Sequence, residues 1–218
     1  VIGARIMLAN GRNPILGYGA LLKGAFGSNY KLANTLAKTS PLVLTGLATS
    51  IAFNAGISNI GGEGQLYLGA FAAALVGISL GPLPKVLAIG LAIVAGALVG
   101  GLYAYFPGKL KLKYGVDEVI TTIMLNTVAI LFTGYLVNNF FAASDAKMSG
   151  TDLIGQSFQM KKLVRLSTLN SSIFLVILIT ILSYYLMMKT SRGYEFKMVG
   201  QNKVFADYGG INSKKSMI

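Results

Sequence analysis

The residues best suited to chemistry lie in a glycine-rich stretch, residues 55–65, between two apolar segments. Within hydrocarbon every peptide group needs an internal hydrogen-bond partner, so irregular backbone is tolerated only where protein buries it or where it lines a cavity. Amide and carboxylate side chains in such a place can hydrogen-bond a polar solute. The stretch is therefore a candidate solute or ion pathway, and the candidate pathway residues are Asn54, Asn59, Glu63, Gln65 and, from a later apolar run, Asn126.

Structural alternatives stand beside this interpretation. Glu63 at a helix start can be satisfied by the free amides of its own first turn. Asn126 can serve either as an interhelical hydrogen-bonding group or as a pathway residue, because polar groups at such depth usually face the interior of a bundle. Asp117 and Glu118 precede the same apolar run, and we expect both carboxylates to cap its first turn.

Residue content disfavours catalysis and metal binding. The chain has no Cys and no His, which removes thiolate sites, the commonest metal ligand and the usual general base. It also has no Gly-x-x-x-x-Gly-Lys-Ser/Thr phosphate-binding motif, so any ATP would be bound elsewhere. We predict a protein that is not an enzyme, with no catalytic residue, metal site or cofactor of its own.

Composition and run lengths predict an all-α polytopic bundle of transmembrane helices. The chain is 54% hydrophobic and 12% charged, with a mean hydropathy of +0.64, far from the roughly one-quarter charged residues of soluble domains. Four of its uncharged runs reach the roughly 20 residues that a spanning helix needs. The first span is expected to be short or broken at the glycine-rich stretch, and sharp breaks are expected at 81–84 and 106–108. The predicted spans cover residues 41–56, 64–81, 85–106, 118–141 and 168–188.

Three segments follow from the charge distribution: a basic or interfacial segment (1–40), the bundle (41–188) and a cytoplasmic loop (189–215). The last holds six Lys and Arg residues against two acidic ones, and short cytoplasmic loops concentrate basic residues. The loop 142–165 then lies outside, where Lys161, Lys162 and Arg165 fit this rule poorly. The net charge of +12 does not predict nucleic-acid binding, because the basic residues flank apolar spans instead of forming a stripe.

Small residues on two neighbouring spans predict close helix packing. Gly96 and Gly100 form a Gly-x-x-x-Gly pair, and Gly69, Ala73 and Gly77 make a similar stripe on the preceding span. In lipid such residues let helix backbones approach closely. They carry no information about a solute.

The residues from Pro41-Leu42-Val43-Leu44 through Phe53-Asn54-Ala55-Gly56 to Asn59-Ile60-Gly61-Gly62-Glu63-Gly64-Gln65 closely resemble permease subunits of bacterial ABC importers. The similarity is to the ribose and branched-chain amino acid type, particularly its nucleoside (simple sugar) subgroup. A second stretch, 190–211, resembles the cytoplasmic coupling loop of that family, although Lys197 and Lys203 stand where Arg and Pro are common. The resemblance assigns contact with the ATPase to Gly193, Lys197, Gly200, Asn202, Ala206 and Gly210.

The resemblance implies a multi-pass permease subunit in the bacterial cell membrane, and the chain is expected to be a fragment of a longer permease. The implied partners are an ATP-binding subunit that holds the ATP, a second permease subunit, an extracytoplasmic substrate-binding lipoprotein and membrane lipid, without nucleic acid. The implied solute is a nucleoside or a simple sugar. A secondary transporter or channel for a small polar solute is the alternative, because broken helices near the midplane are typical of those proteins too.

Overall fold

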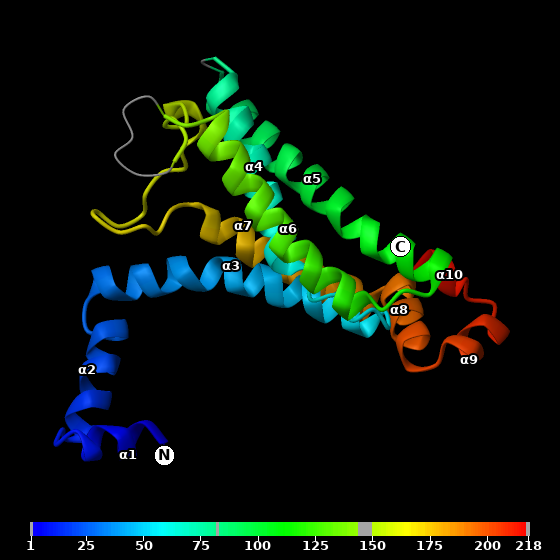
Figure 1. Ribbon diagram of the computed structural model, residues 1–218, viewed down its shortest axis with the longest axis horizontal. Coiled ribbons are helices and arrows are strands. Elements are labelled where there is room, and N and C mark those ends of the chain that lie inside the picture. Colours follow the sequence, from blue (N-terminus) through cyan, green and yellow to red (C-terminus); the bar gives the residue numbers. More distant parts are fainter. Residues whose placement is uncertain (1, 82, 144–149, 217–218) are drawn as a thin grey trace. The chain divides into compact units, whose positions relative to one another are not determined.

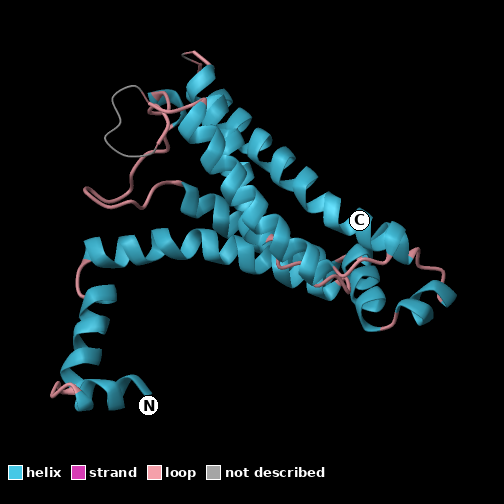
Figure 2. Ribbon diagram, in the orientation of Figure 1, coloured by secondary structure: helices cyan, strands magenta, loops and turns pink. Residues whose placement is uncertain are grey.

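The computed structural model describes residues 2–81, 83–143 and 150–216, so part of the predicted outer loop, 144–149, lies outside the described residues. Helices dominate this part of the chain, and no strand is formed in it apart from an isolated bridge between Lys162 and Asn170 (Figure 2). The all-α prediction is confirmed. The helices are α1 (Ile2–Ala9), α2 (Pro14–Phe26), α3 (Asn29–Asn54), α4 (Gly62–Ser79), α5 (Lys85–Tyr114), α6 (Glu118–Asn139), the short 3₁₀ helix η1 (Gln156–Phe158), α7 (Ser172–Lys189), α8 (Ser191–Gln201), α9 (Lys203–Tyr208) and α10 (Ser213–Ser216).

The chain forms two compact units. The first comprises residues 1–44 and 160–179, and the second comprises residues 45–159 and 180–218. Within the first unit, Asn13 caps α2 by accepting a hydrogen bond from the Ile15 amide at 2.9 Å. Pro14 is the first residue of this helix, where a missing amide hydrogen costs nothing.

Among the described residues, four helices are long and apolar enough to cross a membrane: α3, α5, α6 and α7. The predicted span 64–81 corresponds to α4, which is not in this set and whose first turn carries Glu63 and Gln65. Helix α3 starts before the predicted first span, and Pro41 lies inside the helix.

The expected break at 106–108 is wrong. Helix α5 continues through Pro107, which is buried, and ends at Gly115, whose φ of +67° is in the left-handed region that favours glycine. Proline removes one helical hydrogen bond, and membrane helices tolerate that loss where their surroundings compensate for it. The extra turns carry Lys111 to the start of α6.

The core of the second unit is the packing of α4 against α5 and α6, which lie side by side (Figure 1). At the contact of α4 with α5, a Cβ atom on Gly69 would lie 2.9 Å from the carbonyl oxygen of Gly96, and one on Gly96 would lie 3.0 Å from the carbonyl oxygen of Gly69. A Cβ atom on Gly100 would likewise lie 3.2 Å from the carbonyl oxygen of Gln65. The predicted small-residue packing is confirmed, since only glycine permits these backbone contacts.

We expect Gly69→Val to separate α4 from α5 and to destabilise the full-length protein by about 1–3 kcal/mol, the usual cost of overpacking. Gly90→Val on α5 is the matched control, because a Cβ atom there meets nothing within 4 Å. Thermal unfolding in detergent measures both. Equal unfolding temperatures for the two variants would show that this contact does not hold the helices together.

Candidate functional site

The candidate pathway is the irregular segment between α3 and α4, residues 55–61, called the break below. It starts as a glycine cap of α3: the Ile57 amide donates to the Ala52 carbonyl at 3.0 Å and the Gly56 amide to the Phe53 carbonyl at 3.1 Å. Gly56 has a φ of +77°, which this type of cap requires. The cap turns the chain out of the helix, and the amides that follow need partners from elsewhere.

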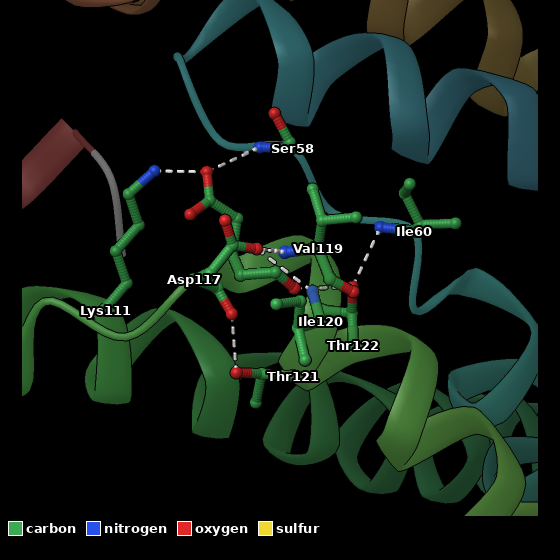
Figure 3. A network of polar contacts seen from close by, with 9 residues as sticks. Ser58, Ile60, Lys111, Asp117, Val119, Ile120, Thr121 and Thr122 are labelled. Atoms are coloured by element: carbon green, nitrogen blue, oxygen red, sulfur yellow. Dashed lines mark hydrogen bonds and ion pairs between the residues drawn. The ribbon is translucent and has the colours of Figure 1, made fainter.

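Side chains on one face of α6 supply those partners. Glu118, Thr122 and Asn126 are spaced four residues apart and therefore line one face of the helix. The Ser58 amide donates to Glu118 Oε1 at 3.2 Å, and the Ile60 amide donates to Thr122 Oγ1 at 3.3 Å. Figure 3 shows these amides of the break facing the first turn of α6. Hydrogen bonds from α6 thus replace those that a helix would have made.

Asn126 is the third of these α6 side chains, and it bonds both the break and the first turn of α4. Its Oδ1 accepts from the Gly64 amide at 2.8 Å, and its Nδ2 donates to the Ile60 carbonyl at 3.0 Å. The approach is close, because a Cβ atom on Gly64 would lie 2.9 Å from the same Oδ1. The interhelical role considered for Asn126 is therefore present, directed at backbone.

The two carboxylates before α6 have different roles, which corrects the expectation that both cap the helix. Asp117 does so, accepting from the Val119 and Ile120 amides at 2.8 and 3.0 Å. Glu118 instead forms an ion pair with Lys111 while holding the Ser58 amide. The pair exists because α5 extends past Pro107 to bring Lys111 opposite the start of α6.

Asn59 and Gln65 also belong to this site. Asn59 Oδ1 accepts from the Gly61 amide at 2.8 Å and from Gln65 Nε2 at 3.4 Å. Asn59 also lines a cavity of about 190 Å³ together with Glu118 and Thr122. The rest of the lining is Ala52, Ile57, Gly101, Ala104, Tyr105, Pro107 and Gly108. The cavity is apolar with a few hydrogen-bonding groups, as sites for small polar molecules commonly are.

Two predicted pathway residues lie apart from this cavity. Asn54 ends α3, where its side chain donates to the Ser50 carbonyl at 2.8 Å and lines a different cavity. Glu63 is exposed on the first turn of α4, and in the part of the chain that the structure describes its carboxylate has no hydrogen-bond or ion-pair partner. The structure brings Asn59, Gln65 and Asn126 together, without these two.

Several residues predicted to contact an ATPase also shape the 190–211 segment. The Gly193 amide is capped by Thr190 Oγ1 at 3.2 Å, and Gly193 packs against backbone carbonyls at the end of α7. Asn202 caps α9 by accepting from the Phe205 amide at 3.0 Å. Gly210, with a φ of +82°, ends α9 in the same kind of glycine cap as Gly56.

Helix α8 packs directly against the break. A Cβ atom on Gly200 would overlap the Asn54 carbonyl oxygen and lie 3.0 Å from the Gly56 amide nitrogen. In return, a Cβ atom on Gly56 would lie 3.1 Å from the Gly200 Cα. Two glycines therefore allow the predicted cytoplasmic loop and the predicted pathway to meet backbone to backbone.

A small apolar core extends this contact. Val199 and Ala206, which are 3% and 1% exposed, join α8 to α9 and pack against Ile57 of the break and Leu112 of α5. Lys197, the remaining predicted contact, directs its Nζ to Met188 Sδ at 3.0 Å. The segment α8–α9 is thus packed onto the break and the last turns of α5.

The exposed face of α9 carries large apolar side chains. Val204, Phe205 and Tyr208 are 64%, 61% and 89% exposed. Sequence reasoning missed Tyr208, and it missed Lys111, Glu118 and Thr122 as site residues. The spacing of four between Glu118, Thr122 and Asn126 was the available signal, because it places them on one helical face.

The sequence matches one protein family and several curated proteins. Residues 31–218 match the family model described as "Branched-chain amino acid transport system / permease component". The chain is 34% identical to the guanosine ABC transporter permease protein NupP of Bacillus subtilis, covering 99% of this chain and 62% of NupP. It is 35% identical to the nucleoside ABC transporter permease protein NupB of Lactococcus lactis, covering 100% of this chain and 62% of NupB.

A more distant relative is the glucose ABC transporter permease protein TsgB13 of Haloferax volcanii, with 27% identity over 97% of this chain and 58% of TsgB13. The chain therefore spans about three-fifths of the length of these curated relatives. No solved structure matches it.

Removal of the Asn126 amide should loosen the break, because the Gly64 amide and the Ile60 carbonyl lose their shared partner. Each buried unsatisfied group costs about 1–3 kcal/mol. We expect Asn126→Ala to raise amide hydrogen exchange selectively in residues 55–65. Asn139→Ala is the control, since its side chain donates only to the Tyr135 carbonyl of its own helix. Unchanged protection in Asn126→Ala would mean that α6 does not hold the break.

Proposed function

Because the chain belongs to the branched-chain amino acid transport system permease family, we propose that it forms the solute pathway of an ATP-driven ABC importer for nucleosides or simple sugars. Membership confirms the resemblance of residues 41–65 and 190–211 to that family. Together with the four apolar helices it also confirms the predicted multi-pass membrane location. Permease subunits are transport components and not enzymes. The names of NupP and NupB support a nucleoside solute.

The observation that carries the proposal is the contact of α8 with the break through Gly200 and Gly56. The 190–211 segment faces a separate ATPase, which binds the ATP and docks on the exposed apolar face of α9. Displacement of α9 moves α8, because Val199 and Ala206 pack the two helices together. Through Gly200 the displacement reaches the end of α3.

The three α6 side chains that bond the break then determine which helices move with it. Since Glu118, Thr122 and Asn126 hold the break by its backbone, a shift of the break is transmitted to α6 and the start of α4. The cavity beside Asn59 lies on this route. Packed elements of this kind switch between discrete arrangements and do not deform continuously. This property suits a solute path that opens alternately to the two sides of the membrane.

Amide and hydroxyl groups in the cavity match the hydrogen-bonding groups of a nucleoside or sugar. At about 190 Å³ the cavity is smaller than the roughly 300–1,000 Å³ of whole ligand sites. We infer that the break forms a constriction on the path and that other residues complete the solute site. Of the predicted pathway residues, we assign contact with a passing solute to Asn59, which lines the cavity, and to Gln65, which donates a hydrogen bond to Asn59. Asn126 positions the break.

Uptake of labelled nucleosides and simple sugars into vesicles tests the proposal. The vesicles hold the full-length permease with its partner subunits, and ATP is either enclosed or omitted. We expect ATP-dependent accumulation of nucleoside. Accumulation of sugar alone would correct the solute class, whereas flux without ATP would replace the importer with a secondary transporter or channel.

Coupling is tested separately by Gly200→Val and Ala206→Asp. The first pushes α8 off the Asn54 carbonyl and the second buries a charge in the small core, so both should abolish ATP-dependent uptake without preventing membrane insertion. Gly134→Val is the control, because a Cβ atom at Gly134 meets nothing within 4 Å. Normal uptake by either coupling variant would contradict the proposed route.

The docking face is tested by Phe205→Ser, which should weaken co-purification of the ATPase subunit. Tyr194→Ser on α8 is the matched control, with an aromatic ring of similar exposure, 60% against 61% for Phe205. Retention of the ATPase by Phe205→Ser, or equal loss in both variants, would exclude the α9 face as the specific contact.

A further inference from the structure

A short hairpin precedes α7 in the first unit. Within residues 161–171, Lys162 and Asn170 form an antiparallel bridge, and the Leu163 amide donates to the Leu169 carbonyl at 3.0 Å. The turn inside the hairpin is also bonded internally. The hairpin is therefore a formed structural element.

The tip of the hairpin is anchored from within and from α3. Ser167, 1% exposed, donates through its hydroxyl to the Val164 carbonyl at 3.0 Å. Asn34 Oδ1 on α3 accepts from the Thr168 amide at 3.0 Å and from the Thr168 hydroxyl at 3.1 Å. These bonds hold the residues between them in one orientation.

Leu166 occupies that tip in an unfavourable state. Its φ is +65°, the only positive φ among the described non-glycine residues, and its side chain is 84% exposed. A bulky residue in the left-handed region is strained, and such strain persists only where the surrounding structure enforces it. The side chain of Leu166 is so exposed that it buries little surface to offset this strain. Leu163 nearby is 44% exposed as well.

Basic residues surround these leucines. Lys161, Lys162 and Arg165 are all exposed, and none forms an ion pair with a described residue. The whole unit to which they belong, residues 1–44 and 160–179, contains eight Lys and Arg residues and no Asp or Glu. The partner that complements this surface is anionic.

The position of the hairpin identifies the partner. Asn170 Oδ1 accepts from the Ser172 amide at 2.9 Å, where α7 begins, and α7 is long and apolar enough to span the membrane. The hairpin consequently lies at the level where phospholipid headgroups begin. Exposed leucine next to basic residues is the pattern of segments that bind at this interface.

We propose that hairpin 161–171 anchors the protein in a layer of anionic phospholipid. Leu166 inserts toward the acyl chains, and the phosphates of the headgroups accept hydrogen bonds from Lys161, Lys162 and Arg165. The site depends only on α7 crossing the membrane, so it is independent of the proposed import activity. It explains the three basic residues that the positive-inside rule places poorly, because here they bind lipid.

Fluorescence at the tip tests this proposal. The full-length permease carries Leu166→Cys labelled with nitrobenzoxadiazole, which is practical because this part of the protein has no natural cysteine. It is reconstituted in phosphatidylcholine vesicles with or without phosphatidylglycerol, and quenching by nitroxide-labelled phospholipid is measured. Leu153→Cys is the matched control, an exposed leucine (93%) next to Asp152 instead of basic residues.

We expect blue-shifted emission and lipid quenching at position 166, stronger with phosphatidylglycerol, and water-like emission at position 153. Replacing Lys161, Lys162 and Arg165 by Gln should remove the effect of phosphatidylglycerol, since each basic residue contributes about five-fold to binding at an anionic surface. Water-like emission at 166 in both lipids would overturn the proposal. So would emission that shifts only on addition of the purified substrate-binding protein, which would assign the hairpin to an acidic protein face.

Discussion

The hydrogen bonds from α6 to the break are the interaction on which the rest of the second unit depends. In hydrocarbon an unpaired peptide group costs several kcal/mol, so the chain can leave the helical conformation after Asn54 only if other groups bond the freed amides. Glu118, Thr122 and Asn126 do this from successive turns of one helix. Their arrangement makes an irregular backbone compatible with a membrane and binds it to a particular helix.

Glycine makes the remaining contacts short enough for this arrangement. Gly69 and Gly96 bring α4 against α5, and Gly64 lets the Asn126 side chain reach the α4 backbone. Gly200 does the same between α8 and the break. Each site replaces a side chain with backbone contact, and rigid contacts of this kind transmit displacement with little loss. Such a contact joins the 190–211 segment to the break, residues 55–61.

The two units differ in charge. All seven acidic residues of the chain lie outside the first unit, and in the second unit Glu118 is paired with Lys111. In the part of the chain that the structure describes, the basic residues of hairpin 161–171 form no such ion pair. The exposed, strained Leu166 beside them fits the proposed anchoring in anionic lipid better than a role in internal stability.

The sequence by itself determined the class of the protein, its helical content and the importance of residues 55–65 and 190–211. Those features follow from apolar run length, glycine content and charge, which act locally. Tertiary structure decided the rest. The continuity of α5 through Pro107 runs against the local preference of proline, which lacks an amide hydrogen, and the ion pair of Glu118 with Lys111 depends on that continuity. Asn54 and Glu63 lie outside the cavity beside Asn59, and Gly200 meets Gly56. Both results depend on how helices distant in sequence pack. Spacing along the chain specifies which residues share a helical face but not what that face contacts.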